Sequence, residues 1–461
     1  MGYKLSKYLY EDEKEGYVFL YNTYKVDMLK IKKPLFEAIK ENLSDIKENP
    51  ENPVIAKLIE KRYLVEDSVN EDREGDLMYL KTCHSNKQLL LTILPTEGCN
   101  FRCEYCYEEH KQNKMSEETQ EALIKFVRKN LKYYGGLSVS WFGGEPLLYP
   151  EIIEHLSEEF KKICKNFKKP YTAIMTTNGY LLDYDMFCRM KKCNVTNYQI
   201  TIDGPAEVHD KQRFLAGGQP TYDKIISNLM DIKEKEKSKF YTFSLRTNLT
   251  VQSAKAYPKL AQFLKDNFFV DGRFTPRVRI AWNGTNDADY EKNIISDISS
   301  IFGEGSSLEE TQENLQKSMY GITDENALRK NFNEIMFAHY PCYAAKANSF
   351  IFGPDGRLFK CTVHFDDSKD GVAGYLKPDG HLEVNDTIDA KWITQMTAND
   401  KGKCYDCKAY PLCQGVGCPY KMSVRGRRDD ECEAKVAEII STFRVFSSNE
   451  KICADVEEML A

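Results

Sequence analysis

The feature that most constrains the fold is a strand-then-helix pattern that repeats from about residue 88 to residue 283. The expected strands are Leu89–Pro95, Leu137–Phe142, Tyr171–Thr176, Tyr198–Ile202, Phe240–Leu249 and Arg277–Trp282. The expected helices, which carry apolar residues at helical spacing, are Ser116–Tyr133, Pro150–Asn166, Asp183–Lys192, Thr221–Glu236 and Ala254–Asp266. This alternation predicts a parallel α/β sheet, open or partly closed into a barrel, with its chemistry at the C-terminal ends of the strands.

The composition is that of a globular protein without a strong excess of either charge. Of the 461 residues, 42% are hydrophobic and 29% are charged, and the formal net charge is −6. The length favours roughly three globular units, and the charge does not favour a nucleic-acid partner. No signal peptide is visible, and no apolar run approaches the roughly 18 residues that a membrane helix needs. The sequence therefore predicts a cytoplasmic protein.

The segments on either side of the predicted sheet have a different character. Residues 1–80 contain strand, strand, helices and strand, which is a winged-helix-like order but would equally suit a packing extension of the next domain. Residues 284–340 are polar and favour a helical bridge, and the remaining chain is rich in cysteine, glycine and tight turns before a closing helix. The expected domains are 1–80, 85–283, 284–340 and 341–461.

Three cysteines lie on one short loop after the first predicted strand. Cys99, Cys103 and Cys106 are separated by three and two residues, and three thiolates can bind three irons of a four-iron cluster. The fourth iron is then open to a reacting ligand. The alternatives are buried thiols or a zinc site, although zinc favours pairs of C-x2-C knuckles. The chain has 15 cysteines, and in a reducing compartment so many thiols favour metal over disulfides.

With Tyr105 before the last thiol, this loop resembles the C-x3-C-x-aromatic-C signature of the radical S-adenosylmethionine (AdoMet) superfamily. The resemblance implies a partial, TIM-like (β/α)6 barrel that starts with the strand before the signature. It also implies that the open iron binds the amino and carboxylate groups of AdoMet. One electron from the cluster would then cleave AdoMet to a 5′-deoxyadenosyl radical, which abstracts a hydrogen atom from the substrate.

The same resemblance places cofactor-binding residues at the ends of the later strands. Gly143-Gly144-Glu145-Pro146 is similar to the family's GGEP element, whose glycines allow close backbone approach and whose carboxylate faces an ammonium group. The further cofactor-binding candidates are Tyr105, Thr176, Asn178, Asp203, Arg213 and Arg246. Taken alone, the GGEP residues would suit a simple turn, and the later candidates would suit a salt bridge or a strand-end cap.

The C-terminal cysteines resemble a SPASM domain, which houses two auxiliary four-iron clusters. The pattern departs once, with four residues rather than three between Cys413 and Cys418. The resemblance implies a distal cluster bound by Cys404, Cys407, Cys413 and Cys432, and a proximal cluster bound by Cys342, Cys361 and Cys418. Three thiols leave the proximal cluster with an open iron, unless a distant cysteine such as Cys83 or Cys193 completes it. A zinc-ribbon-like knuckle is the alternative.

Three clusters, AdoMet and an open auxiliary iron together resemble the sactipeptide and ranthipeptide maturases, which form sulfur-to-carbon thioethers in ribosomal peptides. The expected partners are a precursor peptide, whose leader adds a strand to residues 1–80, and a flavodoxin- or ferredoxin-type electron donor. No nucleic acid or membrane partner is expected. Carbon–carbon crosslinking, epimerisation and formylglycine formation in sulfatases stay open. Formylglycine formation is disfavoured because Thr362, not aspartate, follows Cys361. An electron-transfer scaffold would need no GGEP element.

Overall fold

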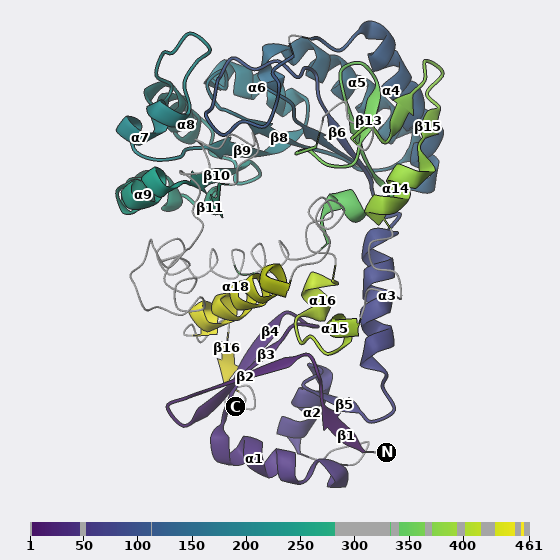
Figure 1. Cartoon of the computed structure of the whole chain (residues 1–461), viewed down its shortest axis with the longest axis vertical. Helices are drawn as coiled ribbons and strands as arrows, with labels where there is room; N and C mark the ends of the chain where they lie inside the picture. Colours follow the sequence, from purple (N-terminus) through teal and green to yellow (C-terminus); the bar gives the residue numbers. More distant parts are fainter. Residues whose placement is uncertain are drawn as a thin grey trace. The chain divides into compact units, whose positions relative to one another are not determined.

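The computed structural model describes residues 2–46, 52–111, 113–281, 332, 341–364, 371–393, 402–415, 429–447 and 453–455. These residues belong to two compact units (Figure 1). The first unit comprises Met1–Cys83, Phe302–Ala345 and Thr394–Ala461, and the second comprises His84–Ile301 and Lys346–Ile393. Apart from residue 332, the helical bridge expected at 284–340 lies outside the described residues.

The second unit is built on a ten-stranded sheet with the order β11-β10-β9-β8-β7-β6-β12-β13-β14-β15. Its strands β6 to β11 are Leu89–Ile93, Leu137–Trp141, Tyr171–Thr177, Val195–Thr201, Thr242–Leu249 and Phe274–Ile280. Each of these strands pairs in parallel with the next one in the chain, and β12 (Ser349–Phe352) pairs in parallel with β6. The predicted parallel α/β sheet is therefore confirmed, and within the described residues it is open, with β11 and β15 at its edges.

Helices connect the parallel strands, as Figure 1 shows. Helices α4 to α9 are Glu117–Asn130, Pro150–Phe167, Tyr184–Lys192, Ala206–Gln212, Tyr222–Lys235 and Val251–Leu264. The Ser116 side chain caps α4 by accepting the Thr119 backbone N–H at 3.1 Å, as the serine before two glutamates suggests. Helix α7 was not predicted, because its seven residues are too few to establish a helical pattern.

The sheet continues beyond β12 as short antiparallel strands that the sequence did not predict. They are β13 (Arg357–Phe359), β14 (Gly374–Leu376) and β15 (Leu382–Val384), followed by α14 (Asp386–Ile393). Three residues are too few for an alternating pattern to be recognised. These strands belong to the same compact unit as the parallel strands.

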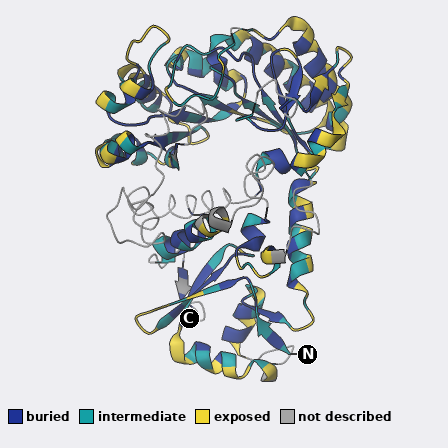
Figure 2. Cartoon of the chain, viewed as in Figure 1, coloured by how far each residue is buried: buried dark blue, intermediate teal, exposed yellow. Residues whose placement is uncertain are grey.

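Burial alternates along the central strands. In β6 and β7, every second residue is buried and the residues between are half-buried, and Figure 2 shows the buried residues in dark blue. The pairing register places the less buried residues on one face of the sheet. Members of that face include Thr92, Ser138, Ser140, Thr172 and Thr176. The face is therefore largely polar, and it leads to the loops that carry the candidate site.

The first unit contains an antiparallel meander of β2 (Leu9–Lys14), β3 (Tyr17–Asn22) and β4 (Asp27–Lys32). Strand β16 (Cys453–Asp455) pairs in parallel with β4, and β1 (Tyr3–Leu5) pairs with β5 (Leu64–Glu66). The helices of this unit are α1 (Lys33–Glu41), α2 (Pro53–Glu60), α3 (Glu71–Cys83), α15 (Gly402–Tyr405), α16 (Tyr410–Cys413) and α18 (Asp429–Ser447). The winged-helix interpretation stays a prediction.

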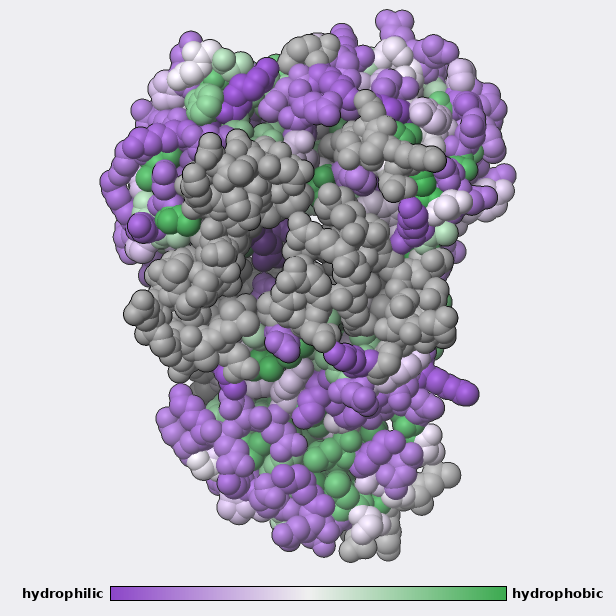
Figure 3. Space-filling model, viewed as in Figure 1, coloured by the Kyte–Doolittle hydropathy of each residue, from purple (hydrophilic) through white to green (hydrophobic). Residues whose placement is uncertain are grey.

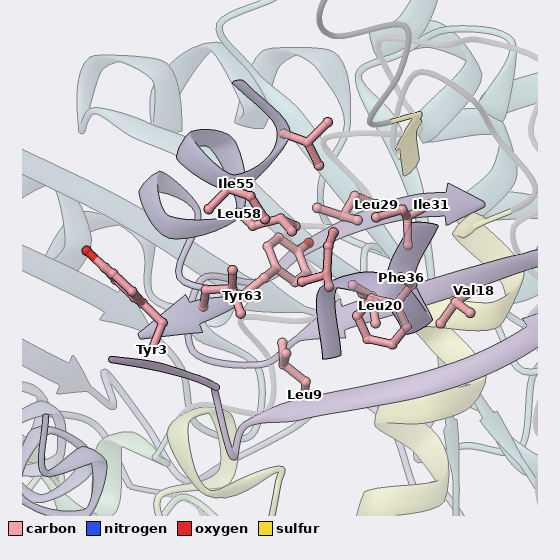
Figure 4. Close-up of a cluster of buried hydrophobic side chains, with 13 residues drawn as sticks. Tyr3, Leu9, Val18, Leu20, Leu29, Ile31, Phe36, Ile55, Leu58 and Tyr63 are labelled. Atoms are coloured by element: carbon pink, nitrogen blue, oxygen red, sulfur yellow. The ribbon is translucent and has the colours of Figure 1, made fainter. Parts of the chain in front are cut away.

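Several apolar clusters hold the first unit together, and two of them involve the meander. One joins the meander to α1 and α2, with Leu20, Leu29 and Phe36 fully buried (Figure 4). The other joins the meander to α18, where the rings of Tyr21 and Phe443 stack with their centroids 5.0 Å apart. The C-terminal helix and strand therefore belong to the core of the N-terminal meander.

Polar residues dominate the described surface in the view of Figure 3. Among the described residues, no helix is both long enough and apolar enough to cross a membrane.

Candidate functional site

The three-cysteine loop follows β6 and is fixed by backbone contacts with the end of α7 and the segment after it. Phe101 is buried and forms an antiparallel bridge with Leu215. The Arg102 N–H donates to the Phe214 carbonyl at 2.9 Å, and the Glu104 N–H donates to the Gln212 carbonyl at 3.0 Å. These bonds lie between and beside Cys99, Cys103 and Cys106, so the thiols are carried by an ordered backbone.

The three thiols lie in a desolvated, acidic environment. Burial raises the pKa of each thiol, that of Cys106 to about 12, and nearby acidic groups raise all three further. Cys103 acts electrostatically on both Cys99 and Cys106, so the thiols are neighbours. Iron binding would replace their protons. Among the described residues, no three His, Cys, Asp or Glu side chains form a site for a single metal ion, whereas a four-iron cluster takes each thiolate on a different iron.

The predicted GGEP element touches the cysteine loop through its backbone. The Glu145 N–H donates to the Gly98 carbonyl at 2.9 Å. A Cβ on Gly144 would lie 2.2 Å from that carbonyl oxygen, and a Cβ on Gly143, whose φ is +117°, would lie 2.2 Å from the Thr96 carbonyl oxygen. The two glycines are therefore required by the contact between the β7 loop and the cysteine loop.

Glu145 is fully buried and joins the ends of two strands. Its Oε1 accepts from the Leu147 N–H at 3.0 Å and from the Thr177 hydroxyl at 2.7 Å, and its Oε2 accepts from the Asn178 N–H at 2.8 Å. Burial raises the pKa of Glu145, and these donors oppose the rise. Pro146, also buried, begins the short 3-10 helix Pro146–Leu148. The carboxylate that the resemblance assigned to an ammonium group thus already has three donors.

Tyr105, beside the last thiol, is the centre of a buried polar network. Its hydroxyl donates to Asp203 Oδ2 and accepts from Arg213 Nη1 at 2.5 Å and from Asn248 Nδ2 at 3.1 Å. Asp203 is fully buried, and its Oδ1 accepts the Asn248 N–H at 2.7 Å. Arg213, predicted to pair with the cofactor carboxylate, is placed 3.8 Å from Asp203 Oδ2. Pairing of Arg213 with the cofactor carboxylate stays a prediction.

A buried histidine contacts the residues that hold this network in place. The Asp203 N–H donates to His209 Nδ1 at 3.2 Å, so the ring carries its proton on Nε2, which lies 3.2 Å from the Thr221 hydroxyl. Thr221 in turn donates to the Arg213 carbonyl at 2.6 Å. Burial, and then the Arg213 charge, lower the pKa of His209 well below its usual value. The neutral ring therefore fixes the backbone on both sides of the ion pair.

The remaining cofactor candidates lie at the ends of β8 and β10. Asn178 donates to Asn100 Oδ1 at 2.7 Å, and its Nδ2 lies 3.9 Å from the Cys99 sulfur. Thr176 is half-buried on the polar face of the sheet. Arg246 donates through Nε to Asn248 Oδ1 at 2.8 Å. Asn248 was not predicted, although its place at the end of the fifth parallel strand is the signal that identified Arg246.

The predicted auxiliary-cluster ligands fall into different parts of the structure. Burial raises the pKa of the Cys407 thiol, and Cys413, Cys404 and Cys432 raise it further, so the four expected distal ligands are close enough to interact within the first unit. Of the expected proximal ligands, Cys342 belongs to the first unit and Cys361 to the second. Cys418 lies outside the described residues.

Comparison with known proteins agrees with this arrangement. Residues 93–267 match the family model of the radical SAM superfamily. The chain is 26% identical to Fe-coproporphyrin III synthase of Methanosarcina barkeri, over 37% of this chain and 39% of that protein. It is 30% identical to the serine-type anaerobic sulfatase-maturating enzyme of Bacteroides thetaiotaomicron, over 32% and 37%. The chain thus spans less than half the length of these two relatives. Residues 93–267 are therefore similar to a radical SAM domain.

The similarities that cover more of the chain have lower sequence identity. The cysteine-type anaerobic sulfatase-maturating enzyme of Clostridium novyi is 22% identical over 72% of this chain and 88% of that protein. The solved structure of anSMEcpe with bound AdoMet and Cp18Cys peptide has a TM-score of 0.59 at 20% identity, covering 78% of this chain and 98% of that one. Streptococcus suis SuiB bound to precursor peptide SuiA has a TM-score of 0.50 at 15% identity, covering 94% and 100%. These structures share the fold of this chain.

The contact between the β7 loop and the cysteine loop makes a direct prediction. Gly144→Ala should force the Gly98 carbonyl away from its position, because the added Cβ would lie 2.2 Å from its oxygen. We expect the variant to lose about 1–3 kcal/mol of stability and to retain less iron after reconstitution. Gly272→Ala is the matched control, since nothing lies within 4 Å of its Cβ. Equal melting temperature and iron content in both variants would contradict the contact.

Proposed function

We propose that this chain is a radical AdoMet enzyme of the SPASM type that joins a cysteine sulfur to a carbon atom in a ribosomally synthesised peptide. The observation that carries the radical chemistry is the three-thiol loop at the C-terminal end of β6, in contact with the Gly143–Gly144 turn. A peptide substrate is supported by the two solved structures of the same fold, which contain the Cp18Cys peptide and the precursor peptide SuiA.

The residues of the site suit the expected cofactors. Cys99, Cys103 and Cys106 would hold a four-iron cluster, which together with AdoMet supplies a 5′-deoxyadenosyl radical that abstracts a hydrogen atom from the substrate. The Tyr105 network fixes the loop from one side, and the Glu145 contacts fix the β7 and β8 ends from the other. The polar face of the sheet, which carries Thr176, would then accommodate the polar cofactor.

The thioether is proposed from the cysteine count of the C-terminal region. Cys404, Cys407, Cys413 and Cys432 would complete a distal cluster, whereas Cys342, Cys361 and Cys418 would leave one proximal iron available for a substrate thiolate. Joining sulfur to carbon removes one hydrogen atom from the carbon and one proton from the thiol. The single electron left over requires an acceptor, and a bound auxiliary cluster provides one.

Formylglycine formation in a sulfatase is the second candidate. It is favoured by the similarity to the Clostridium novyi sulfatase-maturating enzyme, which extends over 88% of that protein. Against it stands Thr362, which follows Cys361 and offers no carboxylate as a base. Asp366 and Asp367, the nearest alternatives in sequence, lie outside the described residues.

Peptide recognition is proposed for the meander of the first unit. Leaders add a strand to an exposed sheet edge. Strand β16 pairs with β4 at one edge of the sheet, and β2 forms the other edge of the described sheet. We place the added strand on β2.

The radical cluster can be tested by removing its ligands. Replacing Cys99, Cys103 and Cys106 together with alanine should lower the iron content by about four of roughly twelve irons per chain and abolish 5′-deoxyadenosine formation. Iron is measured by a colorimetric assay and the nucleoside by chromatography. Cys188→Ala, at a half-buried cysteine outside every motif, should leave both values unchanged. Continued AdoMet cleavage by the triple variant would refute the assignment.

The thioether assignment depends on the proximal cysteines. Replacing Cys342, Cys361 and Cys418 with alanine should preserve uncoupled AdoMet cleavage but stop crosslink formation, because the substrate sulfur would lose its binding site. Mass spectrometry of the precursor peptide detects the loss of two hydrogens that accompanies each thioether. Undiminished crosslinking by this variant, with the Cys188→Ala protein as reference, would rule out a thiol-binding role.

The leader site can be tested with two neighbouring prolines. Successive residues of an edge strand turn their N–H groups alternately toward the sheet and outward, and proline has no N–H. Glu11 and Asp12 suit this test because each makes one ion pair, with Lys40 and Arg444. The two variants are Glu11→Pro and Asp12→Pro. The one that removes an N–H turned toward β3 should lower the melting temperature. The one that removes an outward N–H should keep the melting temperature but weaken leader binding, as measured by fluorescence anisotropy. If the stable variant binds leader normally, the leader does not pair with β2.

A further inference from the structure

Arg213 lies directly opposite Cys103, the middle thiol of the cysteine loop. Two backbone hydrogen bonds, of 2.9 and 3.0 Å, join the residues on either side of Cys103 to the residues on either side of Arg213. The bridge between Phe101 and Leu215 continues the same antiparallel register. Side chains of directly opposed residues in an antiparallel pair project to the same side and lie close together. The Arg213 side chain is therefore placed beside the Cys103 thiol.

One nitrogen of this guanidinium group lacks an acceptor among the described residues. Arg213 is buried, and its Nη1 donates to the Tyr105 hydroxyl at 2.5 Å and lies 3.8 Å from Asp203 Oδ2. Its Nε atom is also buried but has no hydrogen-bond partner within the described residues. A buried donor without an acceptor is costly, so an acceptor that becomes available at this position is bound favourably.

The electrostatics of the loop indicate which acceptor suits this donor. Burial raises the pKa of Cys103, and among the charged groups that act on this thiol Arg213 acts most strongly and lowers the pKa. Asp203 acts in the opposite direction and less strongly. A cluster bound through Cys103 would bring thiolate and sulfide sulfurs, which accept hydrogen bonds, to the Arg213 side chain. A buried cation with a donor to spare fits such a group.

We propose that Arg213 raises the reduction potential of the cluster bound by Cys99, Cys103 and Cys106, by directing its positive charge and its Nε–H to a cluster sulfur. Uptake of an electron makes the cluster more negative, and positive charge and hydrogen bonds at the sulfurs stabilise that reduced state. Arg213 thereby eases electron transfer from the donor protein to the cluster. The inference rests on the proposed function, because it assumes that a cluster occupies the loop.

This role is separate from the predicted pairing of Arg213 with the cofactor carboxylate. That pairing concerns bound AdoMet, whereas the effect on the potential is present in the protein without AdoMet. The potential is therefore measured before AdoMet is added.

The test is a redox titration of the iron-reconstituted full chain, monitored anaerobically by electron paramagnetic resonance. The signal of the loop cluster is the one that is missing when alanine replaces Cys99, Cys103 and Cys106. At a given potential, Arg213→Gln should have a ratio of reduced to oxidised cluster about tenfold lower than wild type, which is a fall of about 59 mV for one electron. Asp203→Asn removes the opposing charge with little change of shape and should raise the potential.

The matched control is Arg189→Gln. It removes an arginine from an ion pair with Glu154, which joins α6 to α5. Its potential should equal that of wild type.

The opposite signs of the two shifts separate an electrostatic role from a structural one. Disturbing the buried pair without acting on the cluster gives no reason for opposite shifts. Shifts of the same sign, or an unchanged potential in Arg213→Gln, would overturn the proposal. Should Arg213→Gln lose its iron, Arg213→Lys decides the question, because it keeps the buried charge but has no Nε–H. Its potential should fall, and an unchanged value would refute the role of Arg213.

The same measurements distinguish this inference from the proposed function. If wild type and the triple alanine variant have the same iron content and the same signals, no cluster occupies the loop, and the proposed function fails together with this inference. If wild type has the loop cluster but the expected shifts are absent, only the role of Arg213 is refuted.

Discussion

The structure of the site depends on one contact, the backbone approach of the β7 loop to the cysteine loop. The Glu145 N–H bonds the Gly98 carbonyl at 2.9 Å, and no side chain larger than hydrogen fits at Gly144 while that bond exists. The Glu145 carboxylate then accepts from the Thr177 hydroxyl and from the Asn178 N–H at the end of β8. Three consecutive strand ends are thereby held in one arrangement, and the position of the first thiol follows from it.

The second support comes from the opposite side of the loop. The Tyr105 hydroxyl is hydrogen-bonded to Asp203, which follows β9, and to Asn248 on β10. Arg213 and Asp203 are both buried, and removing either partner of a buried ion pair leaves an uncompensated charge. Such networks specify one geometry because each group has few alternatives. The loop is thus fixed between β7–β8 and β9–β10, at the C-terminal ends of the strands where the sequence placed it.

The sequence could predict the sheet and the loop because both depend on local patterns. Alternating strands and helices, and the spacing of Cys99, Cys103 and Cys106, are visible in short windows of sequence. The contact of Arg213 with Tyr105 was not predicted, because the two residues lie 108 positions apart in the chain. Strand β13 was missed because it has only three residues.

The distribution of charge around the thiols has a consequence for what the site can hold. Arg357 neutralises Glu97, and Arg213 faces Asp203, so these two buried arginines are already paired. Binding a cluster through three thiolates adds negative charge beside Glu108, whose own charge acts on the same sulfurs. In a desolvated environment like charges raise the energy of one another. Among the described residues, Glu108 therefore opposes the negative charge that a bound cluster adds.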